Sequence, residues 1–195
     1  MFVEKYLRAL HANDLRDDGI NDATDALAAA ALADLSGGSR NVFGSLLVRA
    51  KYAHPIPQHG ADGAGRTIAA LLRAWTEAVT AKGLARGWMK IKHEWDIKAA
   101  TAMYAKIARV SLAHWLAGEC AVCHGTRVDG ERGCTACAGS GREPIRGGAV
   151  EREKVADMVS ELEGLYQSHC ARAGARLRRA PPATQKELGA ANKHP

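Results

Sequence analysis

Apolar residues recur at intervals of three or four along much of the chain, which is the spacing that places them on one face of an α-helix. The pattern is clearest between Thr67 and Ala81, where Ile68, Leu71 and Trp75 would share a face. Together with the alanine- and leucine-rich composition near the N-terminus, it predicts six helices, over residues 1–15, 23–35, 41–53, 67–81, 96–117 and 150–170. We therefore expect a mainly α fold.

Glycine and proline divide these helices. Ser36-Gly37-Gly38-Ser39 is typical of a flexible joint, and His54-Pro55-Ile56-Pro57 should end the third helix. We expect residues 60–65 to form a loop and Gly83 to end the fourth helix. Gly44 weakens the prediction of the third helix by about 1 kcal/mol relative to alanine.

The segment from Cys120 to Gly141 interrupts the helical pattern with two C-x-x-C pairs separated by ten residues. One such pair brings two thiolates to one ion from a tight turn, and two pairs complete the tetrahedral sulfur shell of a closed zinc site. Glycines behind each pair allow the positive φ angles that such turns need. The spacing predicts one structural Zn²⁺, held by Cys120, Cys123, Cys134 and Cys137.

Three other interpretations of these cysteines fit less well. Disulfides require export, and residues 1–10 have charges and no apolar core of a signal peptide. The Cys120–His124 stretch matches a c-type haem attachment pattern, which would leave the second pair unexplained, so we expect His124 to be a turn residue. A redox dithiol usually lies beside a βαβ pattern, and none surrounds these pairs. We expect Cys170 to be a small buried apolar residue.

Charge is distributed unevenly along the 195 residues. Residues 1–38 hold three Lys/Arg and seven Asp/Glu, whereas residues 39–118 hold twelve and four. We expect a helical body with one inserted four-cysteine zinc finger, divided into an acidic, alanine-rich N-terminal arm (1–38), a basic helical body (39–118), the zinc finger (119–148), a C-terminal helix packing on the body (149–179) and a flexible tail (180–195).

The basic body indicates a polyanionic partner, with nucleic acid the first candidate, although a merely solvated basic surface remains an alternative. Between Lys82 and Lys98, lysines alternate with Trp88 and Trp95, a mixture that can hold phosphates and stack on bases. We expect Trp95 to enter the core and leave Trp88 open. The candidate nucleic-acid-binding residues are Lys82, Arg86, Lys90, Lys92, Lys98, Arg127, Arg132, Arg142, Arg146, Arg172 and Arg176.

No catalytic constellation emerges from the sequence. Its eight histidines are scattered, and it has no phosphate-binding G-x-x-x-x-G-K-[ST] loop and no nucleophile elbow. No apolar run approaches the roughly 18 residues of a membrane span. We expect a binding protein of the cytoplasm rather than an enzyme or a membrane protein.

The cysteine motifs resemble two families. One is the zinc domain of DnaJ-type co-chaperones, built from C-x-x-C-x-G-x-G repeats; here there are two repeats rather than four, and Arg127 stands where a glycine belongs. The stronger resemblance is to the Q antitermination proteins of lambda-like phages. It includes Phe43-Gly44 ahead of the basic body, the long helix entering the first cysteine pair, and the Leu165-Tyr166-Gln167-Ser168-His169-Cys170 segment.

The resemblance to Q proteins implies a function in late transcription. Such a protein would bind a DNA element beside the phage late promoter and load onto bacterial RNA polymerase paused with its sigma factor. It would then travel with the enzyme and its elongation factors, next to the nascent RNA, and suppress pausing and termination in the cytoplasm of the bacterial host. The alternatives are a DnaJ-type chaperone-like zinc protein and a plain zinc-dependent DNA-binding repressor.

Overall fold

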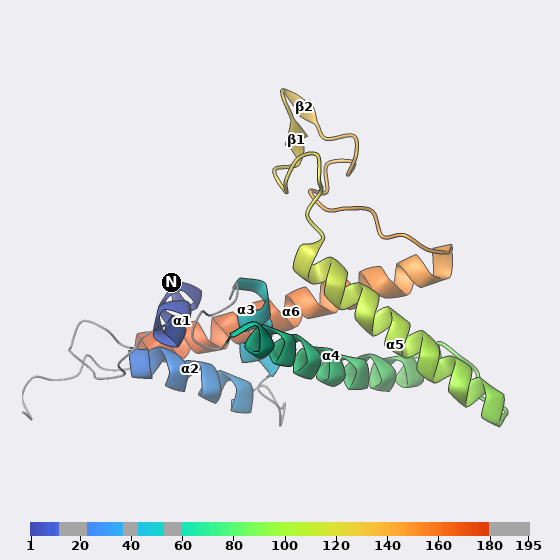
Figure 1. Ribbon diagram of the computed structural model, residues 1–195, viewed down its shortest axis with the longest axis horizontal. Helices are drawn as coiled ribbons and strands as arrows, with labels where there is room; N and C mark the ends of the chain where they lie inside the picture. The colour runs from blue at the N-terminus through green and yellow to red at the C-terminus, as the bar shows by residue number, and fades with distance from the viewer. Residues whose placement is uncertain (12–22, 37–42, 53–59, 180–195) are drawn as a thin grey trace, which may run out of the picture. The chain divides into compact units, whose positions relative to one another are not determined.

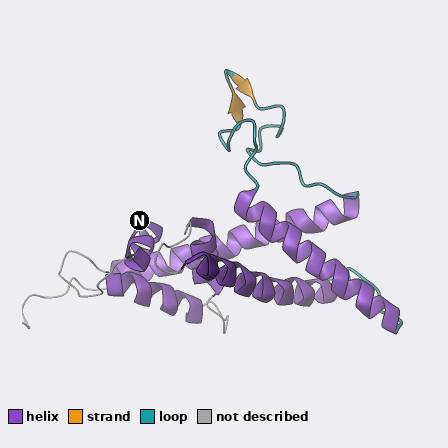
Figure 2. Cartoon of the chain, viewed as in Figure 1, coloured by secondary structure: helices purple, strands orange, loops and turns teal. Residues whose placement is uncertain are grey.

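The computed structural model describes residues 1–11, 23–36, 43–52 and 60–179, and most of them are helical (Figures 1 and 2). The mainly α prediction is confirmed. In the described part of the chain, no helix is both long enough and apolar enough to cross a membrane. The elements are α1 (Phe2–His11), α2 (Ala23–Ser36), α3 (Phe43–Tyr52), α4 (Gly60–Ala85), α5 (Glu94–Ala117), β1 (Val128–Asp129), β2 (Arg132–Gly133) and α6 (Ala149–Arg179).

Contacts divide the chain into two compact units. One comprises Met1–Ile56 and Tyr166–Pro195, and the other comprises Pro57–Leu165. The first part of α6 therefore belongs to the second unit and its remainder to the first. This division groups α3 with α1 and α2, whereas the charge pattern had placed residues 43–52 in the basic body. The tail predicted for residues 180–195 and the joint at residues 37–39 lie outside the described residues.

The second unit is built on α4 and α5, which run antiparallel (Figure 1). Buried residues of α4, including Leu71 and Val79, form its core with residues of α5 such as Ile107 and Leu112. The first part of α6 adds three fully buried side chains, Val155, Met158 and Leu162. The indole N–H of Trp75 donates to Ser111 Oγ at 2.9 Å, which satisfies the polar atoms of two buried side chains from different helices.

Helix α4 is longer than predicted at both ends. It begins at Gly60, so the loop expected over residues 60–65 is wrong, and it continues past Gly83 to Ala85. A Cβ at Gly83 would lie 2.4 Å from Tyr104 Cε1, which is well inside contact distance. Gly83 is therefore a close-packing position against α5 rather than a helix stop. Trp88, just beyond, is half-buried, with its ring centroid 6.3 Å from that of Tyr104.

Helix α5 begins two residues before the predicted Asp96. Asp96 Oδ2 accepts the backbone N–H groups of Lys92 at 2.8 Å and His93 at 2.9 Å, and these bonds lower the Asp96 pKa. The expectation that Trp95 enters the core is wrong, because its side chain is 78% exposed. Nine residues separate it from the buried Tyr104, and at about 100° per residue this places Trp95 on the opposite side of the helix.

The first unit packs α1, α2, α3 and the C-terminal part of α6 around a small core. Its buried apolar members are Phe2, Tyr6, Ala30, Ala33, Val48 and Ala173. The rings of Phe2 and Tyr6 stack at 5.6 Å between centroids. Helix α6 was predicted to end near Cys170 but continues to Arg179, because Ala173 is fully buried in this core.

A buried carboxylate joins α2 to α3. Asp34, in the last turn of α2, accepts the backbone N–H groups of Gly44 at 2.9 Å and Ser45 at 3.2 Å, and also the Ser45 hydroxyl at 2.6 Å. These amides lie in the first turn of α3, where N–H groups have no intrahelical acceptor and the helix dipole favours negative charge. Asp34 thus caps α3 from a neighbouring helix.

The imidazole of His169 completes this junction from α6. It is fully buried, and its Nδ1 lies 3.2 Å from Asp34 Oδ1. A Cβ at Gly44 would lie 2.2 Å from that same nitrogen. Gly44 is therefore required for the imidazole to lie against the start of α3, which explains a glycine inside a helix where intrinsic propensity disfavours it.

Replacing Asp34 with Asn should destabilise the first unit by roughly 1.5–3 kcal/mol at neutral pH, the range for a hydrogen bond to a charged group. Burial raises the Asp34 pKa, but the adjacent His169 imidazole and the hydrogen bonds from Ser45 outweigh this effect, so the folded pKa lies below the unfolded one. The charged form is therefore stabilising above about pH 4, and this contribution is lost as pH falls through the folded pKa.

Thermal denaturation of Asp34→Asn and the parent protein across pH measures this. The parent protein should be more stable than Asp34→Asn by the largest amount at about pH 6–7, and this difference should become smaller below about pH 4. Asp25→Asn, which changes an exposed carboxylate on the same helix, is the matched control and should have only a small effect on stability. A difference that stays constant down to acid pH would contradict the capping role.

Candidate metal centre and nucleic-acid interface

The four cysteines of the two C-x-x-C pairs converge on one point. Their sulfur atoms all lie within 4.8 Å of one another, and all four residues are buried. The Cys120 and Cys134 sulfurs are 3.9 Å apart, and those of Cys123 and Cys137 are 3.7 Å apart. A tetrahedron with metal–sulfur bonds of about 2.3 Å has edges of about 3.8 Å. The cluster therefore has the dimensions of a tetrathiolate site and could hold one metal ion.

Two similar turns bring the sulfurs together. In each turn, the residue after the second cysteine and the glycine that follows have positive φ: 46° and 81° for His124 and Gly125, 49° and 74° for Ala138 and Gly139. Each turn closes with a backbone hydrogen bond to the carbonyl of the first cysteine of its pair, at 2.8 Å and 3.0 Å. His124 is thus a turn residue, as expected from the sequence.

Two hydroxyls that the sequence analysis did not single out support these turns. Thr126 Oγ1 donates to the Cys123 carbonyl at 2.6 Å, and Ser140 Oγ donates to the Cys137 carbonyl at 2.7 Å. Both occupy the third position after the second cysteine of their pair, in Cys-His-Gly-Thr and Cys-Ala-Gly-Ser. This repeated hydroxyl was the sequence signal that could have identified them.

The sulfurs are not electrostatically equivalent. Burial raises the Cys137 pKa, but hydrogen bonds from the Gly141 N–H and neighbouring thiols outweigh it and lower the pKa to about 6. The Cys137 backbone lowers the Cys134 pKa, but burial and thiol hydrogen bonding outweigh this and raise it to about 11. The two sulfurs interact, and the thiolate is favoured on Cys137. A thiolate is the form that binds metal.

Backbone packing between the two turns leaves no room for a side chain at Gly141. Its φ is 76°, and a Cβ there would lie 2.9 Å from the Gly125 carbonyl oxygen. Arg127, which replaces the glycine of the C-x-x-C-x-G-x-G repeat, has a φ of 71°. A non-glycine residue in this region costs of order 1–3 kcal/mol. The Arg127 carbonyl accepts the Cys134 N–H at 2.9 Å, and this hydrogen bond connects the two turns.

The residues between the two cysteine pairs form a short hairpin, drawn in orange in Figure 2. Asp129 of β1 pairs with Arg132 of β2, and Gly130 in the connecting turn has a φ of 63°. A two-residue loop that begins with glycine suits a tight hairpin connection. All four strand residues are exposed, so the hairpin contributes no core of its own.

The segment between α5 and α6, residues 118–148, is called the cysteine module below, and contacts join it to both helices. The Glu143 N–H donates to the Gly118 carbonyl at 3.0 Å, where the chain leaves and enters the module. The buried Trp115 donates its indole N–H to Glu163 Oε2 at 2.9 Å, and Arg142 lies 3.9 Å from that same oxygen. These contacts dock the module on the C-terminal end of α5, where Figure 1 shows it.

The four arginines predicted to contact nucleic acid near the cysteines all belong to this module. Arg127, Arg132 and Arg146 are exposed, whereas Arg142 is half-buried beside Glu163. Arg127 and Arg132 lie on the turn and hairpin between the cysteine pairs. No ion pair is seen for the three exposed arginines within the described residues, so their charges are available to a partner.

Among the basic residues from Lys82 to Lys98, the first two differ from the rest. Lys82 pairs with Glu161, and Arg86 pairs with Asp157, both on α6. By contrast, Lys90, Lys92 and Lys98 are exposed, and the described structure shows no carboxylate paired with them. Acidic residues of α6 thus neutralise part of the basic stretch predicted from the sequence. Its lysines that are unpaired in the described structure lie in residues 90–98, called the α4–α5 corner below.

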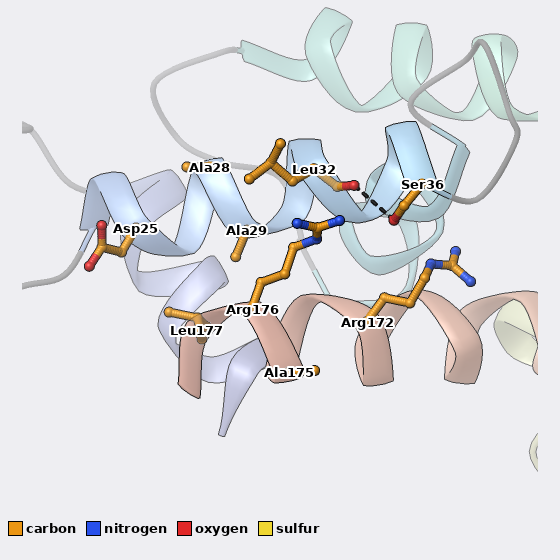
Figure 3. Close-up of a pocket in the computed structure, with 9 residues that line it drawn as sticks. All are labelled: Asp25, Ala28, Ala29, Leu32, Ser36, Arg172, Ala175, Arg176 and Leu177. Atoms are coloured by element: carbon orange, nitrogen blue, oxygen red, sulfur yellow. Dashed lines mark hydrogen bonds between the residues drawn. The ribbon is translucent and has the colours of Figure 1, made fainter. Parts of the chain in front are cut away.

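The last two predicted residues lie on the C-terminal part of α6, in the first unit. Arg172 Nε donates to the Ala33 carbonyl at 3.2 Å, near the C-terminus of α2, and Arg176 is exposed. Figure 3 shows the Arg176 side chain extending toward α2 across a groove of about 610 Å³. The groove is lined by Asp25, Ala28, Ala29, Leu32, Ser36, Arg172, Ala175, Arg176 and Leu177. Arg172 thus has a structural role in joining two helices.

No protein-family profile, curated protein or solved structure matches this chain.

Replacing Cys134 with Ser should abolish stoichiometric metal binding, because three sulfurs cannot complete the tetrahedral shell. The turns and hairpin should unfold with it, since a structural metal contributes directly to folding. Elemental analysis of the purified protein should give one metal ion per parent chain and a strong loss in the variant.

Cys170→Ser is the control and should leave the metal content unchanged, because Cys170 lies on α6 in the other unit. Cys170 is half-buried there, so the expectation that it is buried is wrong. A parent protein with no bound ion, or with two, would contradict the single-site geometry.

Proposed function

We propose that this chain is a phage late-gene antitermination factor of the Q type. In this proposal it recognises a DNA element near the late promoter, loads onto paused bacterial RNA polymerase and suppresses pausing and termination. It acts by binding rather than by catalysis, and it works in the host cytoplasm.

One observation carries this proposal: an arginine-bearing four-cysteine module is fixed to the end of a long helix whose other end carries exposed lysines. The module holds its arginines on turns constrained by four converging sulfurs, which restricts their positions relative to a duplex. Arginine and lysine charges of this kind supply the phosphate contacts on which DNA affinity mainly depends. The long helix separates this surface from the second basic surface at the α4–α5 corner.

The sequence motifs behind the resemblance also have a physical relationship. Gly44 of the Phe43-Gly44 segment lies directly against His169 of the segment 165–170. Two stretches that are far apart in the sequence therefore depend on each other in one buried junction. Their joint presence supports a shared architecture with Q proteins rather than a coincidence of short motifs.

Within the proposal, the metal is Zn²⁺ and its role is structural. Four thiolates in a closed, buried, tetrahedral arrangement suit zinc, which has no redox chemistry and accepts this geometry without preference. Zinc would keep the four sulfurs together and so maintain the positions of Arg127, Arg132 and Arg142. The chain's own residues would make every contact with DNA and polymerase.

Replacing both Arg142 and Arg146 with Ala should weaken binding to the cognate DNA duplex, because two phosphate or base contacts are lost from a rigid surface. The salt dependence should also become shallower by roughly 0.9 per phosphate contact removed, measured as the slope of log K against log salt concentration. Fluorescence anisotropy over a salt series gives both values. An unchanged affinity at moderate salt would mean that the DNA surface lies elsewhere.

In transcription with bacterial polymerase, the protein should raise readthrough of an intrinsic terminator on a template carrying its own late promoter. It should have no effect on a template without the DNA element, because loading depends on that site. A repressor would instead lower initiation and leave readthrough per transcript unchanged, and a chaperone-like protein would change only client aggregation. Charge reversal at Lys90 and Lys92 should reduce readthrough more than DNA loading.

The control for that variant is charge reversal at Arg73 and Arg109, which are exposed on α4 and α5 outside the corner. Equal losses of loading and readthrough in Lys90→Glu/Lys92→Glu would assign this corner to loading alone. Absence of readthrough by the parent protein on its cognate template would remove the antitermination proposal.

A further inference from the structure

The corner between α4 and α5 carries an unusual exposed surface. Trp95 is 78% exposed, Ile97 is 51% exposed and Ile91 is 42% exposed. Single exposed apolar side chains are common, but several within one short segment indicate a surface that binds a partner. None of these residues belongs to the core of the second unit, because the buried face of α5 begins at Ala100.

The charges around Trp95 favour an anionic partner. Lys90, Lys92 and Lys98 are exposed, and Lys98 Nζ lies 5.4 Å from the centre of the Trp95 ring. Two acidic residues share the segment. Glu94 is exposed, but the Asp96 carboxylate is engaged by two backbone N–H groups. The available charge beside the indole is therefore mainly positive.

Trp88, the other tryptophan of this segment, has a different environment. It is half-buried against Tyr104, and the charged ends of Arg86 and Lys154 lie 6.0 Å and 5.6 Å from its ring centre. Those contacts connect α4, α5 and α6 within the second unit, so Trp88 has a structural role. The Trp95 ring, by contrast, is largely accessible.

We propose that Trp95 with Lys90, Lys92 and Lys98 forms a binding site for single-stranded RNA. An accessible indole can stack on an unpaired base of any sequence, and flanking ammonium groups can follow the phosphates. A duplex offers no such face, because its bases are already stacked. The choice of RNA rather than single-stranded DNA rests on the proposed function, in which the nascent transcript is the nearby single strand.

The position of the site separates it from the cysteine module. Trp95 and the module lie at opposite ends of α5, which at 1.5 Å per residue are roughly 35 Å apart. Figure 1 shows the two ends of this helix well separated within the second unit. A DNA duplex at the module and an RNA strand at Trp95 would therefore not compete for the same atoms.

Fluorescence anisotropy with a labelled oligouridine of about 12 nucleotides tests the site on the full chain. Trp95→Ala should weaken RNA binding about tenfold, whereas Trp95→Phe should retain most of the affinity because an aromatic face remains. Arg109→Ala, which removes an exposed positive charge elsewhere on α5, is the matched control and should leave the affinity nearly unchanged. A matched DNA strand should bind with similar affinity, because neither the indole nor the ammonium groups read the 2′-hydroxyl, whereas a hairpin duplex should bind more weakly.

Intrinsic fluorescence supplies a second measurement that a general folding defect would not reproduce. RNA should quench tryptophan emission in the parent protein and not in Trp95→Phe, which keeps the other three tryptophans. Unchanged RNA affinity in Trp95→Ala, or equal quenching in Trp95→Phe, would overturn the site. No RNA binding by the parent protein, with loss of polymerase capture in Trp95→Ala, would assign the surface to a protein partner and also overturn it.

The two proposals fail in different ways. RNA binding that depends on Trp95, without terminator readthrough, would leave this site standing and remove the antitermination function. Full readthrough, with an RNA affinity that Trp95→Ala does not change, would support the antitermination function and overturn the RNA site.

Discussion

Four sulfur atoms that must lie about 3.8 Å apart determine the conformation of the segment that joins α5 to α6. The buried residues from 118 to 143 are only the four cysteines and two glycines, Gly118 and Gly141. This segment therefore has no hydrophobic core, and convergence of the thiols, with the metal they could hold, is what can stabilise it. The left-handed turns, the cost at Arg127 and the hydroxyls of Thr126 and Ser140 all follow from that constraint.

Charge pairing with α6 decides which cations remain available. Acidic residues of this helix pair with Lys82 of α4, with Arg86 just after α4 and with Lys106 of α5, and Glu163 lies beside Arg142. Pairs of this kind on a surface contribute little to stability, so their main effect here is to position the helix and neutralise the body. Exposed basic residues without a carboxylate partner in the described structure include Lys90, Lys92 and Lys98 near the start of α5, and Arg127, Arg132 and Arg146 beyond its end. Both proposed binding surfaces lie there.

In the first unit, a polar junction supplies the specificity that small side chains cannot. Half of the residues of α2 are alanine, and alanine faces can pack against one another in many registers. The contacts of Asp34 with the first turn of α3, and of His169 with Gly44, permit one arrangement, because a side chain at position 44 would collide with the imidazole. A buried polar group without its partners is costly, which disfavours alternative packings.

Much of this protein was determined by local sequence. Six helices and the four converging cysteines were predicted, because helix periodicity and C-x-x-C spacing are short-range patterns that need no knowledge of distant residues. Several of the predictions that were wrong concerned helix ends, which depend on long-range contacts. Gly83 does not stop α4, because it packs on Tyr104, and α6 extends past Cys170, because Ala173 finds a core to enter.

The site shows the same division. Sequence identified the basic residues, but only the tertiary structure decided which of them are neutralised. The acidic partners of Lys82 and Arg86 on α6 are 79 and 71 positions away in the chain. It also decided that Trp95 is exposed and Trp88 is packed. Two tryptophans in one basic segment look alike in sequence. Trp88, in the turn after α4, packs against Tyr104, whereas Trp95 lies on the side of α5 opposite Tyr104.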